Sequence, residues 1–562
     1  EDPHRAGELF TLSDVLAHVR WKAPETFYQA VQFLWLVQAA CLISHGMAAV
    51  LSIGRADQYL YPFYKRDIQA GRITPQFARE LLEELLIKLS CNLLILPEFA
   101  KNTASELGAD NCAVTVGGVD RQGNDAANEL TDLFFDAICE IRSMTNSFSI
   151  RVGSHSSQQY LEKTARVFAH TSGPAVFNDD VICAALSGCG YSAEDARDYS
   201  VIGCVEPAGS NDTFGCTSGN DVSLVGVLEM VFTNGRIRMM GRRTGVATGN
   251  PARFSSFDQV LSAFRRQLAA QVALIAACVN EKDRVYMERF PNPAISMTLT
   301  GCLESGRDMT AGGARYNFGS IGGRGLATTA DSLCAVKKAV FEEKWLSMAE
   351  LVRLLDTNFR DAEDMRLRLL KKTPKYGNDD PEADAMAGWV AKVFCEEVSR
   401  HKNIRGGPFR PGFFSYGMHV YDGMLLGATP NGRRAGEPVS NSLSPSTGSE
   451  TKGPTAVINS YASLCHSRIS NGSSLNIRLS PSLVRCEKGE KNLAALLAGF
   501  VKRGAMHVQF NVVDDTTLRA AQANPENYTD LVVRVSGYCA YFTDLGRAIQ
   551  EDVIRRIAFD RM

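Results

Sequence analysis

The stretch SFSIRVGSHSSQQYLEKTARVFAH, Ser147–His170, contains the pattern that decides the fold. Its first six residues alternate between polar and apolar side chains, which predicts a strand, and the residues from about Ser157 to His170 have the period of a helix. The same signals recur along the chain, with a strand predicted at Asn111–Gly118 and helices predicted at Phe77–Leu96 and Asn128–Ile141. Strands that alternate with helices predict an α/β protein whose strands are buried by flanking helices.

The composition excludes several classes of protein. The chain has 562 residues, of which 45% are hydrophobic, so it can bury a sizeable core. Its 60 Lys and Arg residues balance 62 Asp and Glu residues, which argues against a strongly basic nucleic-acid-binding protein and against an acidic disordered chain. The most apolar segment, Phe27–Ser44, is interrupted by three glutamines and is predicted to be a core helix rather than a membrane span.

Cysteine usage and one change in composition bear on the organisation of the chain. The fifteen cysteines are scattered singly without a Cys-x-x-Cys pair, so neither zinc nor iron–sulfur ligation is predicted. An odd number of cysteines in a large chain argues against a disulfide framework and favours a reducing, anaerobic cytoplasm. The segment Gly427–Pro454 is rich in Gly, Pro and Ser, which predicts a long ordered loop near a domain boundary.

The segment YSVIGCVEP, Tyr199–Pro207, places a thiol and a carboxylate two residues apart. Pro207 disfavours the helical conformation at Glu206, so Cys204 and Glu206 are predicted to be extended, with side chains that face the same space. The commoner meaning of this spacing is a buried structural cysteine beside a surface glutamate. A thiolate nucleophile is not supported, because no Lys, Arg or His stands next to Cys204 in the sequence.

A second segment, LVVRVSGYCAYF at Leu531–Phe542, places Gly537 inside a strand-like apolar run. Such a glycine usually marks a bulge or a close approach of backbone. Radical chemistry offers another reason for glycine, because an α-carbon without a side chain can become planar and delocalise an unpaired electron onto the neighbouring amide groups. A helix with one apolar face is predicted to follow at Asp544–Ile557.

Together the two segments resemble the glycyl radical enzyme family of the pyruvate formate-lyase-like superfamily. GCVEP resembles the active-site cysteine loop of that family, and RVSGY resembles its radical loop, which has the form R-V-x-G-Y. Further matching stretches run in family order along nearly the whole chain, among them GGARYNFGSIGGRGLATTADSL (Gly312–Leu333), GATPNGRRAGEP (Gly427–Pro438) and HVQFNVVD (His507–Asp514).

The resemblance implies a particular architecture. The expected fold is a ten-stranded α/β barrel built from two antiparallel half-barrels and surrounded by helices, with the cysteine loop and the glycine loop meeting inside. A barrel domain is expected at residues 1–435 and a C-terminal glycine radical domain at residues 436–562. Family members are longer at the N-terminus and this chain starts without Met, so we expect an N-terminal region that is missing, shortened or supplied by a partner.

The resemblance also implies a division of labour between three residues. Gly537 would store the radical, Cys204 would pass it on as a thiyl that abstracts hydrogen from the substrate, and Glu206 would be the general base. A radical-SAM activating enzyme with its own iron–sulfur cluster would install the radical, so no cofactor or metal is expected to be bound by this chain. Its expected partners are that enzyme, a small-molecule substrate and a second copy in a homodimer, with no nucleic acid and no membrane, in the cytoplasm of an anaerobic organism.

The residues around the cysteine favour one branch of the family. Gly203 stands where pyruvate formate-lyases have a second cysteine, and Glu206 favours the eliminating enzymes, which are dehydratases and C–N or C–S lyases acting on small polar substrates. Two alternatives stay open. One is a glycyl radical decarboxylase or a carbon–carbon bond-forming, succinate-adding enzyme, and the other is a non-catalytic, degenerate barrel subunit.

The loop after Pro207 is expected to contact the substrate through Thr217, Ser218 and Asp221. An equally weighted alternative is a turn cluster that caps the helix predicted at Val222–Met230. Ser218 stands where relatives that dehydrate glycerol and propanediol carry a His-Asp pair, which argues against a vicinal diol. Choline lyase relatives carry a tyrosine in place of Asp221, although Thr217 fits them, so the sequence assigns no substrate.

Overall fold

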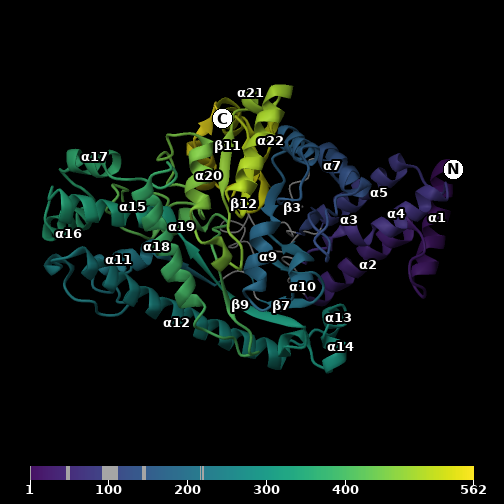
Figure 1. Cartoon of the computed structure of the whole chain (residues 1–562), viewed down its shortest axis with the longest axis horizontal. Coiled ribbons are helices and arrows are strands. Elements are labelled where there is room, and N and C mark those ends of the chain that lie inside the picture. Colours follow the sequence, from purple (N-terminus) through teal and green to yellow (C-terminus); the bar gives the residue numbers. More distant parts are fainter. Residues whose placement is uncertain are drawn as a thin grey trace.

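The structure, a computed structural model, confirms the α/β prediction (Figure 1). It describes residues 2–45, 51–91, 112–141, 147–215, 217 and 220–561. The main sheet has seven strands, which are in spatial order β1 (Gly54–Arg55), β2 (Val114–Gly117), β3 (Phe148–Val152), β4 (Ala175–Asn178), β12 (His507–Val512), β11 (Asn476–Leu479) and β15 (Ala558–Phe559). The first and last thirds of the chain therefore share one sheet.

The main sheet consists of two parallel halves of opposite direction. Strands β1 to β4 are parallel to one another, and so are β12, β11 and β15. The halves meet where β4 pairs with β12 in the antiparallel sense, with Val176 opposite Val508. Because strands from residues before 435 pair with strands from residues after it, the boundary expected at 435/436 does not divide the sheet, and it stays a prediction.

A second, parallel sheet lies next to the first. Strand β9 (Tyr316–Arg324) pairs with β10 (Phe409–Gly412) on one side and with β7 (Thr213–Gly215) and β8 (Asp221–Ser223) on the other. A parallel bridge between Phe413 and Ser473 connects β10 to the segment before β11. Two halves of opposite direction agree with the expected half-barrels, and closure into a ten-stranded barrel stays a prediction.

Helices cover both sheets. The N-terminal group comprises α1 (Pro3–Val19), α2 (Phe27–His45), α3 (Ala56–Tyr59), α4 (Tyr61–Gln69), α5 (Pro75–Ser90), α7 (Glu129–Ile141), α8 (Gln158–His170), α9 (Asp179–Ser187) and α10 (Ala193–Arg197). The middle group comprises α11 (Leu224–Phe232), α12 (Phe257–Arg289), α13 (Pro293–Ser296), α14 (Cys302–Ser305), α15 (Leu326–Val336), α16 (Met348–Asp356), α17 (Glu363–Lys372), α18 (Pro381–Val398) and α19 (Met418–Met424). The C-terminal group comprises α20 (Pro454–Ala462), α21 (Pro481–Val484), α22 (Glu487–Lys502), α23 (Asp515–Ala523) and α24 (Arg547–Arg555).

Helix α8 shows why the quoted stretch folds as predicted. Ser157 is its N-cap and accepts a hydrogen bond from the backbone N–H of Tyr160, which satisfies a donor left free at the helix start. The apolar face of the helix is buried, and the ring of Phe168 lies 5.2 Å from that of Phe510 in β12. The helix that follows β3 thus packs against a strand from the other half of the main sheet.

Three predicted elements differ in extent from the observed ones. The strand predicted at Asn111–Gly118 is β2, Val114–Gly117, and Asn111 lies outside the described residues. The helix predicted at Phe77–Leu96 is α5, which ends at Ser90, and residues 92–100 lie outside the described residues. The helix predicted at Asp544–Ile557 is shorter, because the chain is extended at Leu545 and Gly546 before α24 begins.

Helix α2 bears on the prediction of a core helix rather than a membrane span. By length and composition its window Phe27–Ser44 could cross a membrane, with a mean hydropathy of 1.4, so the three glutamines do not lower the hydropathy enough to exclude a span. The window is 28% buried, and the helix packs against α1 and α5. One helix near an N-terminus carries little weight, because core helices and signal sequences meet the same criterion.

The long loop predicted at Gly427–Pro454 is confirmed. Residues 425–453, all of which the structure describes, contain no helix or strand between α19 and α20. Most of this loop is buried, and Asn441 and Ser442 near its middle are almost inaccessible to solvent. The loop is an internal support rather than a surface connection.

Candidate active site

Cys204 lies at the tip of a hairpin formed by β5 (Tyr199–Ile202) and β6 (Glu206–Gly209). The antiparallel register pairs Ile202 with Glu206 and leaves residues 203–205 as the turn. Gly203 has a φ of 63°, in the left-handed region that favours glycine. The prediction that Cys204 is extended is therefore wrong, because Pro207 constrains only the residue before it and the chain reverses at the cysteine.

Glu206 caps the turn that carries Cys204. Its carboxylate accepts hydrogen bonds from the backbone N–H groups of Cys204, at 3.0 Å, and Val205, at 2.8 Å. The residue is 3% exposed, and this burial raises its pKa to about 7, although the two N–H groups act in the opposite direction. The prediction of a buried glutamate beside Cys204 with a raised pKa is confirmed, and a group with such a pKa can accept and return a proton near neutral pH.

Gly537 lies at the tip of a second hairpin, formed by β13 (Val532–Arg534) and β14 (Cys539–Tyr541). Its φ of 88° is again in the left-handed region. A methyl carbon added to its α-carbon would lie 2.7 Å from Cβ and 3.5 Å from Sγ of Cys204. The prediction that Cys204 and Gly537 meet is confirmed, although 333 positions separate them in the sequence.

The direction of this contact identifies one hydrogen of Gly537. In an L-amino acid the side chain takes the place of the pro-S hydrogen of glycine, so that hydrogen points at Cys204. With a carbon–carbon bond of about 1.5 Å, the α-carbon itself lies within about 5 Å of the sulfur. Any side chain at position 537 would collide with Cys204, so sterics alone require glycine here.

Arg534 holds the carbonyl group next to this α-carbon. Its guanidinium donates from Nη2 to Gly537 O at 2.7 Å, from Nε to Gln509 Oε1 at 2.7 Å and from Nη1 to Gly173 O at 2.5 Å. The residue is 1% exposed, and every hydrogen-bond partner described for this guanidinium is uncharged. A planar fork of donors thus ties the tip of the Gly537 hairpin to β12 and to the segment before β4.

The buried loop before α20 holds the same hairpin from another side. Ser536 Oγ donates to Asn441 Oδ1 at 2.7 Å and lies 3.2 Å from Ser442 Oγ. Asn441 Nδ2 also donates to Val535 O at 3.3 Å. Sequence analysis missed these two supporting residues, because the composition of the loop predicts its conformation but not its contacts.

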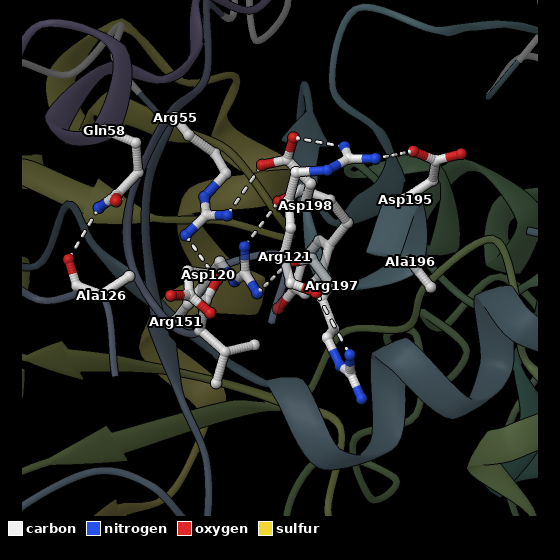
Figure 2. A network of polar contacts seen from close by, with 12 residues as sticks. Arg55, Gln58, Asp120, Arg121, Ala126, Arg151, Asp195, Ala196, Arg197 and Asp198 are labelled. Carbon is white, nitrogen blue, oxygen red and sulfur yellow. Dashed lines mark hydrogen bonds and ion pairs between the residues drawn. The ribbon is translucent and has the colours of Figure 1, made fainter. Parts of the chain in front are cut away.

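A network of charged groups anchors the other hairpin at its base (Figure 2). Arg151 is fully buried, pairs with Asp179 at 2.8 Å and donates to the carbonyl of Tyr199 at 2.9 Å. Arg55, also buried, donates to Asp198 at 2.9 Å. These contacts fix the start of β5, five residues before the cysteine.

Of the three predicted substrate residues, the structure describes Thr217 and Asp221 but not Ser218. The carbonyl of Thr217 accepts a hydrogen bond from Asn471 at 2.8 Å. The side chain of Asp221, in β8, is buried, and its Oδ2 accepts hydrogen bonds from Arg324, at 2.7 Å, and from the hydroxyl of Tyr416. The N-cap of α11 is Ser223, so Asp221 does not cap that helix.

His419 connects helix α19 to the C-terminal helix α24. It is fully buried in α19, and its Nε2 lies 3.0 Å from Asp552 Oδ2 in α24. The neighbouring side chains of His419 and Arg556 keep the pKa of the Asp552 carboxyl below its ordinary value despite burial. The pair therefore docks the C-terminal helix, which follows the Gly537 hairpin, onto the helix that follows Tyr416.

Two family models match the chain. The model described as pyruvate formate lyase-like matches residues 1–423, and the model described as glycine radical matches residues 439–543. The chain belongs to the pyruvate formate lyase-like family of glycyl radical enzymes, as its sequence motifs predicted.

Characterised relatives place the chain among lyases. It is 34% identical to trans-4-hydroxy-L-proline dehydratase of Clostridioides difficile, over 99% of this chain and 70% of that protein. It is also 34% identical to isethionate sulfite-lyase of Oleidesulfovibrio alaskensis, over 100% of this chain and 68% of that protein. The crystal structure of a glycyl radical enzyme from Archaeoglobus fulgidus has a TM-score of 0.95 and 37% identity, and covers 100% of this chain and 71% of that one. The prediction of a glycyl radical lyase is confirmed at the level of this class.

Proposed function

We propose that the chain is a glycyl radical eliminase in which Gly537, Cys204 and Glu206 act in sequence on a small polar substrate. The observation that carries the proposal is the meeting of two hairpin tips. One presents the pro-S hydrogen of Gly537 to the Cys204 sulfur, and the other holds that sulfur beside a buried carboxylate with a pKa of about 7.

The proposed steps conserve atoms and electrons. The Gly537 radical takes the hydrogen of the Cys204 thiol, and the resulting thiyl takes a hydrogen atom from a substrate carbon. The substrate radical then loses its neighbouring hydroxyl, amine or sulfur group while Glu206 accepts a proton from the substrate, and Glu206 passes this proton to the leaving group, which restores the carboxylate. The product radical recovers the hydrogen atom from the Cys204 thiol, and the radical returns to Gly537. The net reaction is an elimination without oxidation or reduction.

The remaining expectations stand as parts of this proposal. Gly537 is buried, so its hairpin must move before a radical-SAM activating enzyme can reach it. A homodimer in the cytoplasm of an anaerobic organism, with domains at residues 1–435 and 436–562, completes the proposal. The pairing of Glu206 with the cysteine turn and the dehydratase and lyase relatives favour elimination over decarboxylation or carbon–carbon bond formation.

A test of the radical relay needs no substrate. If Gly537 and Cys204 exchange hydrogen reversibly, and the α-carbon turns between exchanges so that either hydrogen can face the sulfur, the activated protein in D2O should acquire deuterium on Gly537, because thiol protons exchange with solvent. Electron paramagnetic resonance would detect this as loss of the splitting caused by the α-hydrogen.

The test variant is Cys204→Ser. Its matched control is Cys189→Ser, which changes a partly buried cysteine outside the site. We expect the radical in both variants, deuterium exchange in Cys189→Ser and no exchange in Cys204→Ser. Undiminished exchange in Cys204→Ser would show that Cys204 is not the group that relays the radical.

A further inference from the structure

The carbonyl oxygen of Gly537 accepts hydrogen bonds from two buried side chains. Arg534 donates to it from Nη2 at 2.7 Å, and the hydroxyl of Ser147, directly before β3, donates to it at 3.4 Å. Both residues are almost inaccessible to solvent. The oxygen bonded to the carbon next to the proposed radical position is therefore held by protein donors rather than by water.

The stronger of these donors carries a full positive charge, because an arginine side chain stays protonated in proteins. The other described partners of the Arg534 guanidinium are the amide oxygen of Gln509, the carbonyl of Gly173 and the sulfur of Cys539 at 3.4 Å. None of these partners is a carboxylate. A buried cation without an anionic partner is costly, and a neutral side chain could donate the same hydrogen bonds. The charge of Arg534 therefore needs a reason beyond the support of the hairpin.

The effect of this charge is visible at a neighbouring side chain. His507 lies two residues before Gln509 on β12, so the two side chains project from the same face of the strand. Burial lowers the pKa of His507 well below its ordinary value, and the positive charge of Arg534 lowers that pKa further. The carbonyl oxygen of Gly537 is in direct contact with the same guanidinium, so the field of the charge acts on it at closer range.

A radical at the α-carbon of Gly537 would respond to this field. The unpaired electron is shared between the amide nitrogen and the carbonyl group on either side of the α-carbon, and this sharing moves electron density from the nitrogen toward the carbonyl oxygen. A positive charge fixed at that oxygen stabilises the radical more than the closed-shell peptide, whose oxygen is less negative. A larger share of the unpaired electron then lies on the carbonyl group and a smaller share on the α-carbon.

We propose that Arg534 stabilises the Gly537 radical by drawing the unpaired electron from the α-carbon toward the carbonyl oxygen. The inference rests on the proposed function, which assigns the radical to Gly537. When a hydrogen atom passes from the Cys204 thiol to the Gly537 radical, the S–H bond breaks, the α C–H bond forms and the charge of Arg534 does not change. By lowering the energy of the glycyl radical alone, Arg534 shifts this exchange toward storage on glycine until a substrate arrives.

The test measures the splitting that the α-hydrogen of Gly537 causes in the electron paramagnetic resonance spectrum, because this splitting is proportional to the share of the unpaired electron on the α-carbon. All proteins carry Cys204→Ser, so that neither the relay nor a substrate contributes. Arg534→Gln, which removes the charge, should give a larger splitting than the parent protein. Arg534→Lys, which keeps the charge, should stay closer to the parent. An unchanged splitting in Arg534→Gln, or an equal increase in both variants, would overturn the inference.

A matched control separates the charge from mere loosening of the hairpin. Ser536→Ala removes the hydrogen bond to Asn441 and leaves both donors to the Gly537 oxygen in place. Its splitting should therefore equal that of the parent. An increase as large as that of Arg534→Gln would mean that loosening, and not the lost charge, changes the radical, and the inference would fall.

A second measurement covers an Arg534→Gln protein that does not fold or accept the radical. The parent protein is then labelled with ¹⁵N-arginine, and pulsed electron paramagnetic resonance should detect an isotropic ¹⁵N coupling transmitted through the hydrogen bond from Arg534 to the Gly537 oxygen. Absence of that coupling would overturn the inference. A normal Gly537 radical that ignores Arg534 would refute this inference alone, whereas a fully activated protein without a radical on Gly537 would refute the proposed function.

Discussion

The two hairpins that present the reacting atoms are held in opposite ways. The Cys204 hairpin is capped from within, because the carboxylate of Glu206 in its second strand binds the N–H groups of its own turn. The Gly537 hairpin is held at its tip by side chains from distant parts of the chain, such as Asn441 and Ser442, and by Arg534, which reaches across to β12.

This difference suggests that the Cys204 hairpin is fixed and that the Gly537 hairpin can move. A turn that satisfies its own donors keeps its shape when its surroundings change. A tip that depends on contacts with other segments can leave its place once those contacts break, without disturbing the Cys204 turn. Such a division suits a protein whose glycine must reach an activating enzyme and then return to the cysteine.

The largest expected effect concerns the movable hairpin. A glycyl radical reacts with dioxygen at the α-carbon and the backbone breaks there. Air exposure of the activated protein should therefore yield a chain that ends near Ser536 and should release Tyr538–Met562, 25 residues long. Mass spectrometry of the intact protein measures the cut.

Gly537→Ala should prevent both the radical and the cut, because the added methyl collides with Cys204. Gly504→Ala is the matched control, since Gly504 also has a positive φ, 72°, but has open space around it. A fully activated sample that survives air intact would refute the assignment of the radical to Gly537.

The next effect concerns the self-capped hairpin. Glu206→Gln should leave the Gly537 radical intact and lower turnover by roughly 100-fold or more, the contribution expected of a general base. In the unaltered protein, turnover should rise with pH through about 7, where Glu206 becomes ionised. Substantial turnover in Glu206→Gln, read by mass spectrometry of products, would remove Glu206 from the chemistry.

The free energy of unfolding should also depend on the ionisation of Glu206, and it can be measured without any activity assay. Because burial raises the folded pKa of Glu206 from 4.5 to about 7, its neutral form stabilises the fold below pH 4.5, and this contribution is lost as the pH rises to about 7. The size of the effect is on the order of 3 kcal/mol. Other buried carboxyls titrate in this range too, so the measured quantity is the difference between Glu206→Gln and the unaltered protein in urea unfolding at pH 4.5 and 7.5. A difference that does not change with pH would show that the carboxyl is not desolvated as described.

A further effect should loosen only the Gly537 hairpin. Arg534→Gln removes the planar fork that binds three oxygen acceptors, which we expect to cost about 2–3 kcal/mol and to speed amide hydrogen exchange in residues 535–541. Exchange in the Cys204 turn should stay unchanged. Arg166→Gln, at an exposed arginine, serves as the control. If Arg534→Gln sped amide hydrogen exchange equally in both hairpins, the Gly537 hairpin would not be held independently of the Cys204 hairpin.

The smallest effect should come from one external contact. Ser536→Ala removes the hydrogen bond to Asn441 and leaves a buried acceptor, for a loss of about 1 kcal/mol in the free energy of unfolding. Turnover and radical yield should stay within a factor of about two if the other contacts still seat the hairpin. A loss of stability as large as that of Arg534→Gln would mean that the loop, and not the guanidinium, holds the tip.

Sequence alone predicted those features that local pattern determines. The strand and helix at residues 147–170 follow from periodicity, and the buried loop before α20 follows from composition. The meeting of Cys204 and Gly537 came from family resemblance, because no local rule relates residues 333 positions apart.

The rest could not be predicted, because it depends on tertiary contacts. The rule that Pro207 favours an extended residue before it did not predict the turn at Cys204. Gly203, a residue type common in turns, was the signal for that turn in the sequence. Asn441, Ser442 and Asn471 carry no sequence pattern, since their roles arise from segments brought together by the sheets. Likewise, no sequence pattern shows that Arg324 contacts both Asp221 and Asp422.

The antiparallel junction of β4 and β12 has a consequence for synthesis of the chain. Ala175 pairs with Gln509, so the ribosome must add about 330 residues after β4 before its partner strand emerges. At roughly 5–20 residues per second this takes roughly 20–70 s, during which the nascent chain presents an open strand edge prone to aggregation. Chaperones that shield such edges should therefore raise the yield of folded protein, and Gly537 cannot meet Cys204 before the ribosome has translated the hairpin of β13 and β14.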